Sequence, residues 1–185
     1  MESIRERKKA LRKSVTTRLK LLPGSYRSAA SESIAQQVLA SEEYRGAKRI
    51  FLYIGMPTEP DTAAIIGAAL TDGKDVYVPK CISKTEMLAV RIRSTDDLVP
   101  GAYGIPEPQD CSETIAPDAI DLILVPCVSA WTDGRRLGHG AGYYDRFLKG
   151  NARKTFCLCF RKALSPDIPT DENDVLMHRV ICDPE

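Results

Sequence analysis

The sequence of 185 residues lacks several features that mark particular classes of protein. It has only two histidines, so a metal centre built from several imidazoles is not expected. It has no apolar run near the roughly 18 residues that a membrane-spanning helix needs. It also does not begin with the charged and then apolar segments of a secretory signal. We therefore expect no membrane partner, no secretion and a cytoplasmic location.

The six cysteines include no Cys-x-x-Cys pair. Three of them, Cys127, Cys157 and Cys159, lie within apolar runs. That placement favours small buried side chains over disulfides or zinc ligands.

A net charge of +1 gives the chain no strong overall attraction to nucleic acid. The charge is uneven, however, because residues 1–20 contain eight Lys or Arg, whereas residues 94–134 contain eight Asp or Glu and neither Lys nor Arg. The basic segment has no aromatic side chains between its charges and matches no recognition module. We expect no nucleic-acid partner, and a basic helix that either is solvated or faces an anion.

Helical and strand patterns alternate along the chain. Helices are predicted at 2–21, from Ser25 or Ser28 to about Ala40, at 62–70 with Thr58 as its cap and Pro60 in its first turn, and at 142–149. Strands are predicted at 49–54, 75–78, 87–92, 122–128, 155–160 and 175–181, with a long structured loop at 99–118. This order predicts one domain over residues 1–185: an α/β fold with three layers (α/β/α), a mainly parallel, Rossmann-like central sheet, and the N-terminal helices packed on it.

The most informative segment is the glycine-rich run GRRLGHGAGYYDR at 134–146, between the most apolar strand and a helix. In open α/β sheets, ligands bind where strands end and turn amides point at an anion. Glycines in such a turn let the backbone approach phosphate oxygens, and Arg135 and Arg136 add positive charge. The run is neither a Walker A loop nor GxGxxG, so spacing alone also allows a plain turn with two solvated arginines.

The segment RLGHGAGYYDRFL at 136–148 resembles the signature of the 5-formyltetrahydrofolate cyclo-ligase family. Further segments resemble that family in the same order: KKALR at 8–12, residues 52–62 with Glu59, YGIPEP at 103–108, LVP at 124–126 and DEND at 171–174. The chain departs from the family at Ala130-Trp131, where many members have Phe-Asp, and at Ala163, where a glutamine is common. At position 141 some members have a lysine where this chain has alanine.

This resemblance implies an enzyme that converts 5-formyltetrahydrofolate to 5,10-methenyltetrahydrofolate with ATP and Mg²⁺. ATP would phosphorylate the formyl oxygen, and N10 would then attack the formyl carbon. Arg136 is the implied catalytic residue, contacting the transferring phosphoryl group. We expect it on the surface, so that its removal should affect turnover far more than folding. The implied ATP-binding residues are Lys8, Lys9, Arg12, Arg135, Arg136, Leu137, Gly138, His139, Gly140, Ala141, Gly142 and Tyr143.

The resemblance also implies folate-binding residues and a metal site. The folate would be bound by Ile54, Glu59, Tyr103 and Tyr144, and Mg²⁺ by Asp145 and Asp174. Plainer alternatives stay open: a solvated face for Lys8 and Arg12, a helix start for Glu59, an arginine partner for Asp145, a turn cap for Asp174, core packing for the tyrosines, and a bystander role for His139.

At the level of the whole protein, we expect a monomer. Three alternatives stay open. They are another enzyme on a related scaffold, such as a sugar-phosphate isomerase or a CoA transferase, a nucleic-acid-binding or regulatory protein that uses the basic helix 1–20, and an inactive family member.

Overall fold

The structure is a computed structural model that describes residues 2–101, 104–150 and 154–185. Its main sheet has seven strands in the order β11-β10-β7-β1-β2-β3-β6. The five strands from β11 to β2 run parallel, whereas β3 is antiparallel to both β2 and β6. The strands are β1 (Arg49–Leu52), β2 (Asp75–Cys81), β3 (Met87–Ile92), β6 (Thr114–Ile115), β7 (Leu122–Val125), β10 (Lys154–Leu158) and β11 (Arg179–Ile181). The prediction of an α/β fold with a mainly parallel sheet is confirmed.

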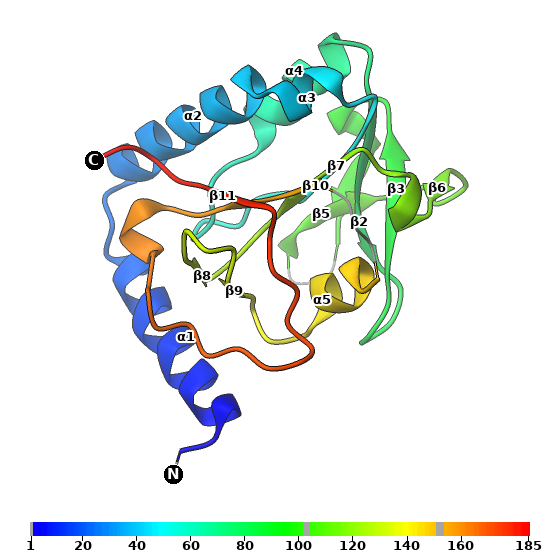
Figure 1. Cartoon of the computed structure of the whole chain (residues 1–185). Coiled ribbons are helices and arrows are strands. Elements are labelled where there is room, and N and C mark those ends of the chain that lie inside the picture. Colours follow the sequence, from blue (N-terminus) through cyan, green and yellow to red (C-terminus); the bar gives the residue numbers. More distant parts are fainter. Residues whose placement is uncertain (1, 102–103, 151–153) are drawn as a thin grey trace.

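Helices cover both faces of this sheet (Figure 1). Figure 1 shows α2 (Gly24–Ala40) and α4 (Ala63–Thr71) on one side and α5 (Tyr143–Leu148) on the other. The short α3 (Glu42–Gly46) follows α2. α1 (Ile4–Lys20) starts with a capping box between Ser3 and Glu6 and packs beside the 3₁₀ turn η4 (Arg161–Ala163). Val15 and Leu19 anchor α1 in the core.

The most apolar predicted strand lies at the centre of the parallel region. All four residues of β7 are buried, as expected for a strand covered on both faces. On the neighbouring β1, the ring of Phe51 stacks 4.9 Å from Phe147 of α5, and Tyr144 lies 6.2 Å away. These ring contacts hold α5, and therefore the glycine-rich turn before it, against the sheet.

Two local predictions are wrong. The structured loop predicted at 99–118 instead contains regular elements: the antiparallel pair β4 (Leu98–Pro100) and β5 (Pro106–Pro108), the strand β6 and the 3₁₀ turn η3 (Pro117–Ala119). The third long helix begins at Ala63, so Thr58 is not its cap and Pro60 lies outside its first turn. At that start, Asp61 Oδ1 accepts from the Ala63 amide at 2.9 Å. Thr62 is occupied elsewhere, donating to the Tyr53 carbonyl at 2.6 Å.

Three short elements complete the description. The strands β8 (Ser129–Ala130) and β9 (Arg136–Leu137) pair in antiparallel fashion and lead into the glycine-rich turn, and η1 (Thr95–Asp97) precedes β4. None of the described helices is both long and apolar enough to cross a bilayer.

Candidate functional site

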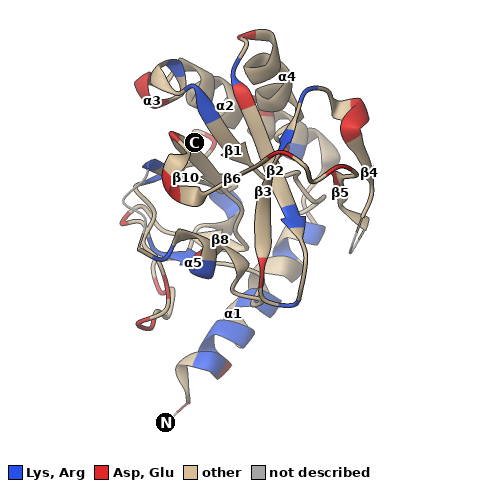
Figure 2. Ribbon diagram, turned by 90° about the vertical axis from the view of Figure 1, so that its right-hand side faces the viewer, with Lys and Arg blue, Asp and Glu red and all other residues tan. Residues whose placement is uncertain are grey.

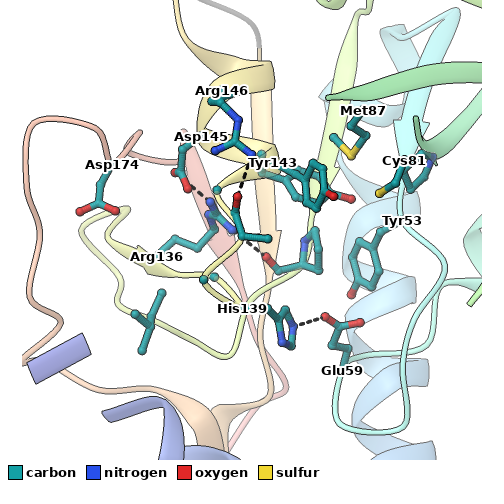
Figure 3. Close-up of a pocket in the computed structure, with 18 of the residues that line it drawn as sticks. Tyr53, Glu59, Cys81, Met87, Arg136, His139, Tyr143, Asp145, Arg146 and Asp174 are labelled. Atoms are coloured by element: carbon teal, nitrogen blue, oxygen red, sulfur yellow. Dashed lines mark hydrogen bonds and ion pairs between the residues drawn. The ribbon is translucent and has the colours of Figure 1, made fainter. Parts of the chain in front are cut away.

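A cavity of about 890 Å³ lies where the parallel strands end. Its wall is formed by α1, by residues that follow β1 and β7, by the turn before α5, and by residues 171–174. The carboxyl edge of a parallel sheet is where ligands bind in open α/β folds. Figure 3 shows the cavity with acidic and basic groups toward Asp174 at one end, and Met87 and Tyr53 at the other.

One end of the cavity is built around the glycine-rich turn, residues 138–142. Within the described part of the chain, the backbone amides of these five residues donate to no other protein group. Gly140 and Gly142 adopt positive φ angles of 104° and 71°, which side chains other than glycine rarely accept. Unpaired amides lining a cavity provide a natural cradle for a phosphate group.

Arg136 lies beneath this turn and is buried. Its side chain is only 3% exposed, and Nη2 donates to Asp145 Oδ1 at 2.8 Å. Nη1 donates to the Pro126 carbonyl at 3.2 Å, whereas the buried Nε has no acceptor among the described residues. A Cβ on Gly138 would lie 2.7 Å from Nη1, so that glycine is what allows the guanidinium to sit there. The expectation of a surface arginine is therefore wrong.

α1 brings two cations to the same end. Figure 2 shows Lys and Arg gathered along this helix. Lys8 Nζ lies 2.7 Å from Asp171 Oδ2 and 2.6 Å from Asp174 Oδ2, and Arg12 Nε donates to the Gly138 carbonyl at 2.8 Å. Lys8 is partly buried, which by itself lowers the pKa of its amine, but the two aspartates outweigh this and raise it. Lys8 and Arg12 thus face the site together, as their i, i+4 spacing predicts.

The other end of the cavity is mostly apolar. It is lined by Tyr53, Ile54, Met56, Pro79, Cys81, Met87, Ile105 and Tyr144. Burial, together with the nearby Glu59 charge, raises the pKa of Tyr144 far above its usual value, so this tyrosine stays protonated. A flat aromatic ligand would fit between such side chains.

Glu59 is a buried carboxylate at this apolar end. Its side chain is 3% exposed, Oε2 accepts from the Met56 amide at 2.9 Å, and Oε1 lies 2.7 Å from His139 Nε2. The tight turn of residues 56–59 positions this carboxylate, because the Glu59 amide in turn donates to the Met56 carbonyl at 2.8 Å. A buried and fixed carboxylate is suited to receive the N–H donors of a ligand.

Two carboxylates at the polar end suit a divalent cation. Oδ1 of Asp145 accepts from Arg136 and from the Val175 amide, and Oδ2 of Asp174 accepts from Lys8. The second oxygen of each accepts no hydrogen bond from the described residues. No cluster of three or more potential metal ligands occurs in the described ranges. Mg²⁺ commonly takes only one or two carboxylates beside phosphate oxygens and water, so this donor set fits it.

The structure brings most of the sequence-predicted residues to this one cavity. Lys8, Arg12, Ile54, Glu59, Asp145, Asp174 and all residues from Arg136 to Tyr144 line it. Lys9 and Arg135 do not. Arg135 donates to Asp133 and to the carbonyls of Ile168 and Pro166, which directs its guanidinium elsewhere. Tyr103 lies outside the described residues.

Several lining residues were given no role from the sequence. They include Met56, Met87, Glu107, Arg146, Lys149 and Asp171. Met56, Glu107, Arg146 and Asp171 lie within segments that the family resemblance covered. Met87 reaches the cavity only because β3 pairs with β2, which no local pattern predicts.

The chain is similar to known proteins over most of its length. The family model described as the 5-formyltetrahydrofolate cyclo-ligase family matches residues 4–183. The 5-formyltetrahydrofolate cyclo-ligase of Mus musculus is 30% identical over 97% of this chain and 95% of its own length. A relative from Arabidopsis thaliana is also 30% identical, over 98% of this chain and 76% of its own.

Similarity extends to solved structures. The NMR structure of Aquifex aeolicus 5,10-methenyltetrahydrofolate synthetase has a TM-score of 0.82 and 30% identity, covering 94% of this chain and 88% of that one. The Arabidopsis relative is named as mitochondrial, so the comparisons leave the compartment of this protein open. The match to the family model over nearly the whole length shows that the chain belongs to the 5-formyltetrahydrofolate cyclo-ligase family.

Proposed function

We propose that this protein converts 5-formyltetrahydrofolate to 5,10-methenyltetrahydrofolate at the expense of ATP. The observation that carries the proposal is the pairing of two unlike ends in one cavity. Free backbone amides and buried or half-buried cations form one end, and apolar side chains around a buried carboxylate form the other. The first end suits a polyphosphate, and the second suits a pterin ring.

The chemistry requires both substrates to be held together. A formamide carbon is a weak electrophile, and its oxygen is a poor leaving group. In the proposed reaction the formyl oxygen attacks the γ-phosphorus of ATP and ADP leaves. N10 then attacks the activated carbon and loses its proton, and phosphate departs with the former formyl oxygen. Holding the reacting atoms in contact supplies much of the acceleration.

The residues of the polar end would stabilise the transferring phosphoryl group. Arg136 is held in place by Asp145 and the Pro126 carbonyl before any substrate arrives, so little reorganisation accompanies transfer. Arg12 and the amides of residues 138–142 would hold the other phosphates. Lys8 is paired with Asp171 and Asp174, so it would exchange or share these partners on nucleotide binding.

Asp145 and Asp174 would hold Mg²⁺ through their unpaired oxygens. The ion would neutralise charge on the phosphate oxygens when bound. The chain's own groups order this region, because Lys8 and Arg136 fix one oxygen of each carboxylate.

At the apolar end, Glu59 would accept the N–H donors of the pterin, and Ile54 and Tyr144 would pack against its ring. Ala141 offers no cation where some family members have a lysine. The phosphates would therefore depend more on Arg12, Arg136 and the backbone amides in this chain.

The direct test mixes the protein with 5-formyltetrahydrofolate, ATP and Mg²⁺ and follows the ultraviolet absorbance of the methenyl product. We expect product only when ATP is present, with one ADP formed per folate converted. Absence of product with intact binding of both substrates would indicate an inactive family member. ATP-independent turnover of a sugar phosphate or a CoA ester would replace the proposal with one of the related-scaffold enzymes.

A further inference from the structure

The side chain of His139 crosses from the glycine-rich turn to the apolar end of the cavity. Figure 3 shows its ring directed at Glu59, where Nε2 lies 2.7 Å from Oε1. The two partners differ sharply in exposure, since the side chain of His139 is 42% exposed and that of Glu59 only 3%. The histidine therefore approaches from the open side of the cavity, and the carboxylate lies at its base.

Glu59 depends on this contact for half of its hydrogen bonding. Its Oε2 is held by the Met56 amide, and within the described residues only His139 is within hydrogen-bonding distance of Oε1. A buried carboxylate oxygen without a donor costs free energy, and the side chain relieves that cost by turning toward water. Removing the imidazole should therefore change where Glu59 points.

The glycine-rich turn, by contrast, is held without the imidazole. Arg12 donates to the Gly138 carbonyl at 2.8 Å on one side of His139, and Arg146 donates to the Ala141 carbonyl at 2.7 Å on the other. Loss of the His139 side chain should therefore leave the backbone amides of the turn in place. The backbone and the side chain of this residue serve opposite ends of the cavity.

We propose that His139 is a positioning residue for the folate: it holds Glu59 in the orientation that receives the pterin. The inference rests on the function proposed above. It assigns the His139 ring to folate binding and not to nucleotide binding. Its backbone amide belongs to the phosphate cradle, while its ring acts on the folate through Glu59. His139 therefore contributes to both substrate sites, with its backbone at one and its side chain at the other.

The test measures the Kd of 5-formyltetrahydrofolate and of ATP separately, by calorimetry, for the wild type, His139→Ala, His139→Gln, Glu59→Gln and the double variant His139→Ala/Glu59→Gln. We expect His139→Ala to weaken folate binding about tenfold, as loss of a hydrogen bond to a charged group does. ATP binding should change by less than about twofold. His139→Gln keeps an N–H donor near the position of Nε2 and should restore most of the folate affinity.

The double variant distinguishes action through Glu59 from a separate effect. In the Glu59→Gln background, His139→Ala should weaken folate binding by less than about twofold further. In steady-state kinetics, His139→Ala should raise KM for the folate with kcat nearly unchanged. His178→Ala removes the other histidine, which is exposed and away from the cavity, and should change none of these values.

The inference would be overturned by a larger loss of ATP affinity than of folate affinity, or by losses from His139→Ala and Glu59→Gln that simply multiply in the double variant. Wild-type protein that binds no 5-formyltetrahydrofolate would instead overturn the proposed function. If the wild type binds and converts the folate and His139→Ala has the same folate affinity, the inference about His139 is wrong while the proposed function stands.

Discussion

The guanidinium of Arg136 and the carboxylate of Asp145 form an ion pair of 2.8 Å at the start of α5, with the arginine almost wholly buried. A cation enclosed in this way is a structural group as well as a candidate catalyst. Removing one partner of a buried pair leaves the other charge uncompensated. Substitutions at position 136 should therefore destabilise the fold, whereas the sequence alone predicted little effect on folding.

Arg136→Ala should both abolish turnover and destabilise the fold. We expect a loss of about 2–3 kcal/mol in the free energy of unfolding, somewhat below the usual cost because Asp145 is 22% exposed and keeps the Val175 amide. Urea denaturation measures the loss. Arg136→Lys keeps the charge and should recover much of the stability but little of the turnover. A wild-type urea midpoint for Arg136→Ala would contradict this prediction.

Replacing Lys8 by Met should remove a stabilisation that depends on pH. The hydrogen bond from Lys8, supported by the Asn173 amide, lowers the pKa of Asp171. The stabilisation that Asp171 contributes is therefore fully present above about pH 3.8, the ordinary pKa of the group, and is lost as the pH falls through its lowered pKa. The pKa of Lys8 is raised despite partial burial. The stabilisation that Lys8 contributes is therefore fully present below about pH 10.5, its ordinary pKa, and is lost as the pH rises through its raised pKa.

The difference in thermal stability between wild type and Lys8→Met should therefore be largest between these limits. At pH 7 we expect the two proteins to differ by about 1 kcal/mol in the free energy of unfolding, since both partners of the ion pair are partly solvated. Melting curves from pH 2 to 11 would show a plateau with a fall at each end. A difference that stays constant across the whole range would argue against the ion pair.

Gly138→Ala should impair catalysis through Arg136. The added methyl group would lie 2.7 Å from Nη1 of Arg136 and would have to push the guanidinium aside. We expect kcat to fall roughly 100-fold, as when an oriented transition-state donor is misplaced. Gly67→Ala in α4 is the matched control, because its methyl group would meet nothing within 4 Å. It should leave kcat unchanged and slightly raise the stability of the helix.

Asp145→Asn and Asp174→Asn should each raise the Mg²⁺ concentration needed for half-maximal turnover. Each variant removes a negative charge from an oxygen that is available to the cation. Titration of activity with MgCl₂ at saturating ATP measures the shift, which we expect to be about tenfold or more. Asp118→Asn changes an exposed carboxylate away from the cavity and should produce no shift. An unchanged requirement in both site variants would place the metal elsewhere.

Much of the site was predictable because its key segments are local. The glycine spacing at 138–142 marks one end of the cavity directly, because ligands bind where strands of an α/β sheet end. Lys8, Arg12 and Glu59 were named only because those segments resemble the family. The burial of Arg136 could not be predicted in this way, because it depends on β9 pairing with β8 and on α5 packing against Phe51.

The β4–β5 pair shows the other limit of sequence-based prediction. Each strand has three residues and includes proline, a composition typical of loops. The Lys80–Glu107 ion pair at 3.0 Å and the packing of β5 beside β2 hold this pair in place. Those are tertiary contacts, which hydrophobic periodicity does not report.

The ion pairs from Lys8 to Asp171 and Asp174 join residues more than 160 positions apart. During synthesis α1 is made first, and its partners Asp171 and Asp174 are made only after every strand except β11. Most of the sheet can thus be made while the polar end of the cavity still lacks one side. The polar end of the cavity is therefore completed by contacts between the two ends of the chain, so it forms only once the C-terminal segment has been made.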